Sequence, residues 1–137
     1  MLMQFQTFLK DNDFKIFLKY DGERENKIYT VKIFNKQNLN NSLGGNTDTP
    51  EELFFQILNE LDCENLEDFN VFFTTFREVI QNIKLQYGET SVVSLIADYL
   101  DENSNYMLFI ANEKKFARCS DTNLQNIISK SKKIALF

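Results

Sequence analysis

Residues 66–87 read LEDFNVFFTTFREVIQNIKLQY and are followed by Gly88. Apolar residues recur in this segment at alternating intervals of three and four positions, a spacing that places their side chains on one face of an α-helix. These residues are Leu66, Phe69, Phe73, Phe76, Ile80, Ile83 and Tyr87. Glycine commonly follows the last turn of a helix. The segment therefore predicts one long amphipathic helix that ends before Gly88.

The apolar stripe of this helix has two alternative uses. Its near-heptad spacing suits the seam of a coiled-coil dimer, but such seams are built mainly from Leu, Ile and Val. This stripe is mostly Phe, and Phe72 and Val79 widen it beyond a narrow seam. We therefore expect the helix to pack into the core of its own domain, with the coiled-coil dimer as the alternative.

Two more helices are predicted beside it. Upstream, Thr49 can cap a helix, Pro50 suits its first position, and Glu52 can complete a capping box, so a helix should run from Pro50 to about Leu61. Downstream, residues 89–91 are expected to open a third helix, because the apolar residues that follow share one helical face. They are Val92, Leu95, Ile96, Tyr99 and Leu100.

Alternating apolar and polar residues predict two β-hairpins, one over about 14–34 and the other over about 106–119. The segment Asn35 to Asp48 follows the first hairpin and is rich in Asn and Gly, with little apolar content. Such a composition is typical of loops. We expect this segment to be a mobile surface loop.

The order of these elements differs from the strict strand–helix alternation of a parallel sheet. We predict an α+β fold in which an antiparallel sheet packs against three central helices. The sheet is built from the two hairpins, with residues 134–137 as a candidate C-terminal strand. Ser120 or Asp121 is expected to cap a short helix before that strand. The chain of 137 residues falls in the size range of one domain, so we expect a single domain over 1–137.

The sequence offers little support for catalysis or cofactor binding. It contains no histidine, which removes the most common general base and the most common metal ligand. Cys63 and Cys119 are far apart and, even with carboxylates, lack the number and spacing of a zinc site. No phosphate-binding glycine motif occurs in the sequence. We expect no enzyme activity, no metal and no cofactor.

The net charge is −5, from 20 acidic and 15 basic side chains. Such a chain is repelled by nucleic acids and by anionic membranes. No apolar run approaches the length of a membrane span, the first residues lack the basic start of a signal peptide, and two isolated cysteines suit a reducing compartment. We expect a cytoplasmic protein whose partner is neither a nucleic acid nor a membrane.

The negative charge is concentrated in residues 37–76, which contain eight carboxylates and no Lys or Arg. Helix dipoles favour acidic residues in a first turn, but they do not account for Glu60, Asp62 and Glu64, which follow a helix. The candidate partner-binding residues are Glu60, Asp62, Glu64, Glu67 and Asp68. Complementary charge predicts a basic protein partner for them. A solvated acidic face is the alternative.

The chain resembles small bacterial immunity proteins, the cognate inhibitors of contact-dependent and other polymorphic toxins. The resemblance rests on the acidic stretch from Asp48 to Asp68, the small size, the Phe-rich α+β pattern and the lack of catalytic groups. It implies a protein that binds a basic toxin domain, often a nuclease, and blocks its active site or substrate surface. A structural or assembly component of a phage or mobile element is the alternative. That component would self-associate, so the oligomeric state is left open.

Overall fold

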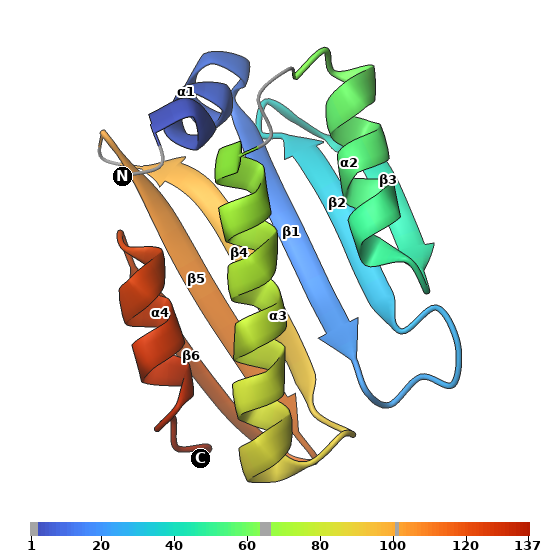
Figure 1. Ribbon diagram of the computed structural model, residues 1–137, viewed down its shortest axis with the longest axis vertical. Coiled ribbons are helices and arrows are strands. Elements are labelled where there is room, and N and C mark those ends of the chain that lie inside the picture. Colours follow the sequence, from blue (N-terminus) through green and yellow to red (C-terminus); the bar gives the residue numbers. More distant parts are fainter. Residues whose placement is uncertain (1–2, 64–66, 101) are drawn as a thin grey trace.

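The computed structural model describes residues 3–63, 67–100 and 102–137, which form one antiparallel sheet and four helices (Figure 1). The strands are β1 (Phe14–Asp21), β2 (Tyr29–Asn35), β3 (Asn38–Thr47), β4 (Val92–Leu100), β5 (Asn103–Asn112) and β6 (Lys115–Asp121). The helices are α1 (Met3–Asn12), α2 (Pro50–Glu60), α3 (Glu67–Tyr87) and α4 (Leu124–Ser131). The predicted α+β class and antiparallel sheet are confirmed.

The strand order across the sheet is β3-β2-β1-β4-β5-β6, which places β1 and β4 in the centre. Both predicted hairpins are present, as the pairs β1–β2 and β5–β6. The two halves of the chain also repeat one element order: a helix, three consecutive strands and a second helix, first from α1 to α2 and then from α3 to α4. The central β1–β4 pair joins the halves.

All four described helices lie on the same face of the sheet (Figure 1). α2 packs on β2 and β3, α1 packs on β1, and α4 packs on β6. Side chains alternate accordingly along each strand. In β1, Ile16, Leu18 and Tyr20 are buried toward the helices, whereas Phe17 and Lys19 point to the other face and are only partly buried. No described helix covers that other face.

α3 forms the centre of the helical layer, and its apolar stripe is buried in the core from Phe69 to Ile83, as predicted. Tyr87 is partly buried, and Leu66 lies outside the described residues. The buried apolar residues of this helix are Phe69, Phe72, Phe73, Phe76, Val79, Ile80 and Ile83. The ring of Phe5 in α1 packs against Phe69 and Phe72, with ring centroids 5.1 and 4.9 Å apart. Gly88 follows the helix with a φ of +95°. This left-handed conformation ends many helices and confirms the predicted boundary.

The prediction of a third central helix after residues 89–91 is wrong, because this segment forms β4. Val93, Leu95 and Ala97 are buried beneath the helices, in the alternation of a strand. Val92 and Ile96 lie on the opposite face, so both faces of this central strand carry apolar residues. A short apolar run of this kind satisfies a helical spacing as well as a strand spacing. The β-branched residues of the segment and its two neighbouring strands favour the strand.

The predicted loop from Asn35 to Asp48 is also wrong over most of its length, because Asn38–Thr47 form β3. This edge strand pairs with β2, and backbone hydrogen bonds hold it although few of its side chains are apolar. Gly44 allows the two strands to approach closely. It has a φ of +109°, and a Cβ atom on it would lie 1.9 Å from the backbone oxygen of Val31.

The ends of the helices differ from two predictions. Thr49 precedes α2, but its side chain makes no capping hydrogen bond. Asn123, rather than Ser120 or Asp121, caps α4, because its side chain accepts the Gln125 N–H at 2.8 Å. The helix α1 had no counterpart among the predicted elements.

Residues 134–137 do not form a regular strand. The tail nevertheless runs beside the outer edge of β6, where Phe116 and Phe137 exchange two backbone hydrogen bonds of 3.0 Å. The candidate C-terminal strand is thus reduced to one strand-like residue pair.

Candidate protein-binding surfaces

Four of the five predicted partner-binding carboxylates belong to the described residues, where they lie at the end of α2 and the start of α3 in different surroundings. Glu60 is the last residue of α2, Asp62 follows it, and both are exposed. Glu67 is the exposed first residue of α3, and Asp68 is partly buried beside it. Glu64 lies outside the described residues.

Asp68 is engaged within the molecule. Its Oδ2 atom accepts hydrogen bonds from the backbone N–H groups of Gln4 at 2.9 Å and Phe5 at 3.1 Å. Both groups lie in the first turn of α1, where backbone N–H groups have no partner inside the helix. The carboxylate therefore caps α1 from a different helix, which assigns Asp68 a structural role.

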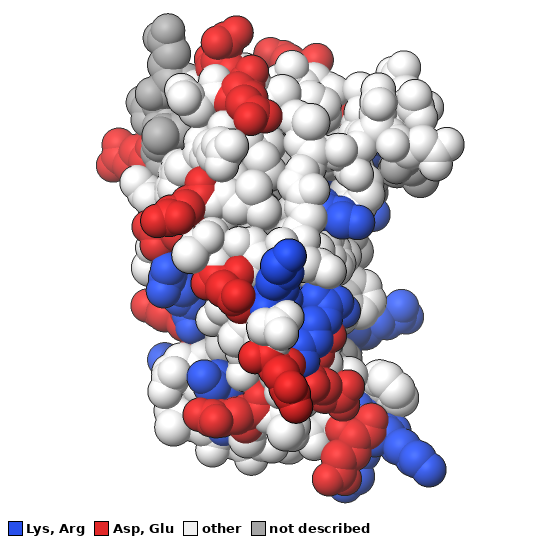
Figure 2. Space-filling view, turned by 90° about the vertical axis from the view of Figure 1, so that its right-hand side faces the viewer, with Lys and Arg blue, Asp and Glu red and all other residues white. Residues whose placement is uncertain are grey.

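Other carboxylates gather at the same end of the molecule, where α1, the end of α2, the start of α3 and the β4–β5 turn lie together (Figure 1). Gln6 of α1 donates from Nε2 to the backbone oxygen of Glu102 at 3.5 Å, which brings that turn against α1. We define the acidic end as the exposed residues Asp11, Glu60, Asp62, Glu67 and Glu102. Figure 2, seen from the side of β3 and α2, shows acidic side chains at this upper end.

Two lysines of the described residues lie at this end: Lys10 of α1 is exposed, with its Nζ 5.9 Å from the centroid of the Tyr99 ring, and Lys36 is held by other carboxylates. Lys36 Nζ lies 2.7 Å from Asp98 Oδ1 and 3.6 Å from Asp13 Oδ1. Burial lowers the pKa of Lys36, but the hydrogen bonds and charges of Asp98 and Asp13 outweigh this effect and raise the pKa above its ordinary value. Within the described ranges, Glu60 and Asp62 take part in no ion pair.

A second surface was not anticipated from the sequence. It is the face of the sheet opposite the helices, which we call the open face. Its main apolar residues are Phe17, Val92, Ile96, Met107, Phe109 and Phe116. The antiparallel register places Phe17 beside Ile96, and Ile96 beside Met107, so these side chains form a band across three strands. Phe17, Phe109 and Phe116 line a hollow of about 490 Å³ on this face.

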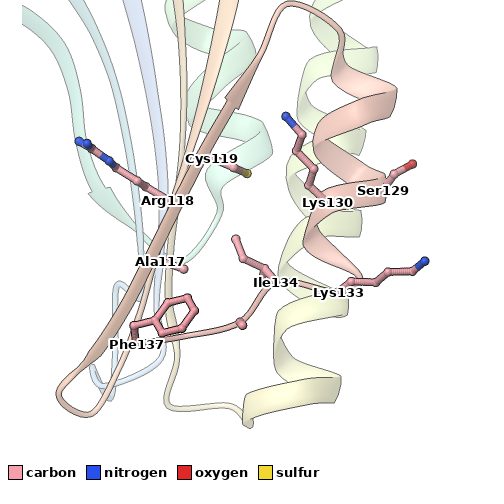
Figure 3. Close-up of a pocket in the computed structure, with 9 residues that line it drawn as sticks. Ala117, Arg118, Cys119, Ser129, Lys130, Lys133, Ile134 and Phe137 are labelled. Atoms are coloured by element: carbon pink, nitrogen blue, oxygen red, sulfur yellow. The ribbon is translucent and has the colours of Figure 1, made fainter.

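The open face also carries four cationic residues, Lys15, Lys19, Lys32 and Arg118. Arg118 pairs in register with Phe109, and Figure 3 shows its side chain pointing away from α4. In the described strands, the two carboxylates on the open face are ion-paired. Asp21 lies 3.5 Å from Lys19 and 3.2 Å from Arg24, and Asp98, which is only 5% exposed, is held by Lys36. The open face is therefore apolar and positively charged.

A groove of about 570 Å³ lies between β6, α4 and the C-terminal tail. Cys119 points into it from β6, facing α4 (Figure 3). Burial raises the pKa of the Cys119 thiol, and the nearby charge of Lys130 only partly opposes this effect. Burial raises the pKa of the Cys63 thiol as well. Because the thiolate is the reactive form, neither cysteine has the environment of an activated nucleophile.

Within residues 3–63, 67–100 and 102–137, no group of three or more carboxylates and cysteines is arranged to hold a metal ion. Among the described helices, none combines the length and apolar character needed to cross a membrane. No family model matches the chain, and no significant match was found among curated proteins or solved structures.

Proposed function

We propose that this protein is an inhibitor of the immunity type, which binds a cognate protein toxin through its acidic end. The observation that carries the proposal is the convergence of exposed carboxylates from α1, the α2–α3 connection and the β4–β5 turn at one end of the molecule. Convergent charge of one sign creates a local field that speeds association with a partner of the opposite sign and disfavours other partners. A basic toxin domain has the required charge.

The residues proposed for contact differ from the set that the sequence indicated. Glu60 and Asp62 are the central contacts, because both are exposed and take part in no ion pair within the described part of the chain. Asp11 extends the surface onto α1, and Glu102 extends it onto the β4–β5 turn, which a hydrogen bond from Gln6 joins to α1. Asp68 supports this surface by holding α1 in place.

The proposal predicts that a gene adjacent to this one encodes the toxin, and rescue of cells that express the adjacent gene tests it. Wild type should protect the cells, and the double variant Glu60→Lys/Asp62→Lys should protect them poorly while remaining folded by circular dichroism. The matched control is Glu23→Lys/Glu25→Lys, which makes the same change in charge in the exposed β1–β2 loop at the opposite end of the sheet. Equal protection by both double variants would contradict the assignment of the acidic end.

The alternative, an assembly component of a phage or mobile element, is favoured by one observation. β3 is an edge strand whose sequence, NLNNSLGGNT, contains no charged residue and no proline. Edge strands usually carry such residues because they block pairing with another chain. An assembly component would form large particles as its concentration rises. An inhibitor would remain small and bind its toxin in a fixed ratio, which sedimentation velocity distinguishes.

A further inference from the structure

We propose that the open face is a second docking surface, separate from the acidic end, and that it binds a segment of a protein partner in which bulky apolar residues are flanked by carboxylates. An antiparallel sheet that packs on the core with one face normally presents polar residues on its other, solvent-facing side. Here Phe109 is 38% exposed and Phe116 is 61% exposed, and they lie on adjacent strands. Contiguous apolar surface of this kind marks interaction sites in soluble proteins.

The hollow on this face is suited to an apolar anchor. Three strands supply its aromatic walls, with Phe17 from β1, Phe109 from β5 and Phe116 from β6. Val92 and Ala111 lie between them and pair directly across β4 and β5, so the floor is formed by short side chains. A hollow with aromatic walls and a low floor accepts a Phe, Leu or Ile side chain from a partner, which is the usual form of an interface hot spot.

Charge complementarity determines the flanking residues of the partner. Lys19 and Arg118 line the hollow itself, and Lys32 lies beside Phe17 in the register of β1 and β2. Lys19 is already paired with Asp21, whereas Lys15, Lys32 and Arg118 take part in no ion pair within the described residues. Arg118 offers a planar guanidinium group that binds a carboxylate through two parallel hydrogen bonds. Acidic residues beside the apolar anchor therefore match the cations around the hollow.

Two other occupants fit less well. Single-stranded nucleic acid could stack on the aromatic rings, but a molecule with a net charge of −5 would repel its many phosphates. The described strands place only four cations on this face to oppose that repulsion. A second copy docked face to face would bring the cations of the two sheets together, and like charges in an interface are unfavourable. A short segment with a few carboxylates carries less negative charge than a polynucleotide, so the net charge repels it less, and its carboxylates are attracted by the cations that would repel a second copy.

The test uses a synthetic, fluorescein-labelled peptide of about ten residues that alternates Glu with Phe or Leu, long enough to cross the sheet when extended. Fluorescence anisotropy compares it with a peptide carrying Lys in place of Glu and with a thymidine oligonucleotide of similar length. The protein variants are Phe109→Ser and Arg118→Glu. Their matched controls are Leu85→Ser, an α3 residue that is 76% exposed, and Lys133→Glu in the tail after α4.

The acidic peptide should bind, and the lysine peptide should not. The Kd of the acidic peptide should rise at least about tenfold in the Phe109→Ser and Arg118→Glu variants, while both control variants keep the wild-type Kd. Glu60→Lys/Asp62→Lys should also keep that value, so failure of this surface and failure of the acidic end are distinguishable. The inference is overturned if the acidic peptide does not bind, if the oligonucleotide binds more tightly, or if the protein forms a dimer that Phe109→Ser dissociates.

Discussion

The Asp68 carboxylate at the start of α3 accepts the backbone N–H of Phe5 at 3.1 Å, although 63 residues separate the two along the chain. The same oxygen accepts the Gln4 N–H at 2.9 Å. The ring of Phe5 packs on Phe69, the residue next to Asp68. One carboxylate and one ring therefore fix α1 against α3, and they hold the α1 side of the acidic end in place.

Asp68→Ala should lower the free energy of unfolding by about 1 kcal/mol, within the range of about 0.5–2 kcal/mol for the loss of a helix cap. Urea denaturation of the purified protein measures this change. Glu60→Ala is the control, and it should change stability by less than about 0.5 kcal/mol because Glu60 is exposed. If the two variants were equally stable, the cap would have no energetic role.

Phe73→Ala and Phe76→Ala should each destabilise the protein by about 3–5 kcal/mol, because both rings are buried on the core side of α3. Leu85→Ala on the same helix should cost little, since its side chain is 76% exposed. Denaturation is measured at two protein concentrations. A loss of stability that depended on protein concentration would identify the stripe as an oligomer seam instead of a core.

Gly44→Ala should destabilise the protein, and the adjacent Gly45→Ala should not. A Cβ atom at Gly44 would lie 1.9 Å from the Val31 backbone oxygen, and its φ of +109° disfavours any other residue. Gly45 has nothing within 4 Å of the same position. Replacing such a glycine can even stabilise a protein by about 0.4–1 kcal/mol, because the unfolded chain becomes less flexible. Equal melting temperatures for the two variants would contradict the close pairing of β3 with β2.

Asp121 should make stability depend on pH in the acidic range. Burial raises the pKa of this carboxyl, but hydrogen bonds from the Asn123 backbone, Asn126 and Lys130 outweigh burial, and the pKa lies below its ordinary value of 3.8. The stabilisation is therefore fully present above that ordinary pKa and is lost as the pH falls through the lower pKa of the folded state.

Asp121→Asn should accordingly be less stable than wild type at pH 7, and the difference should shrink as the pH is lowered from about 5 to about 2. Urea denaturation at a series of pH values measures the difference. A gap that stayed constant with pH would mean that the carboxylate charge contributes nothing to the junction of β6 and α4.

Several elements could be predicted because their signals are local. The stripe of α3 and the alternation in β1 and β2 identify a helix and a hairpin from neighbouring residues alone. β4 could not be separated from a helix, because it lies between β1 and β5 and is apolar on both faces. β3 has few apolar residues, and backbone hydrogen bonds to its partner strand β2 hold it in the sheet.

The two candidate surfaces also differ in how much of their sequence signal is local. Glu60 and Asp62 stand out in the sequence because the surrounding block has no cation. The contribution of Asp11 and Glu102 depends on how α1 and the β4–β5 turn fold against that connection. The open face combines residues from separate strands, and the Lys15-Phe17-Lys19 alternation was its one local signal. Only the one-sided placement of the helices leaves those residues uncovered.

Association kinetics test the central claim most directly. The rate constant for association with the toxin captured from the native host is measured for wild type and Glu60→Lys/Asp62→Lys at several ionic strengths. The acidic end predicts a wild-type rate that falls steeply with salt, and a rate for the variant that is about tenfold slower at low salt and depends on salt more weakly. A folded double variant with the wild-type rate and the wild-type salt dependence would contradict the claim that this end of the molecule binds the partner.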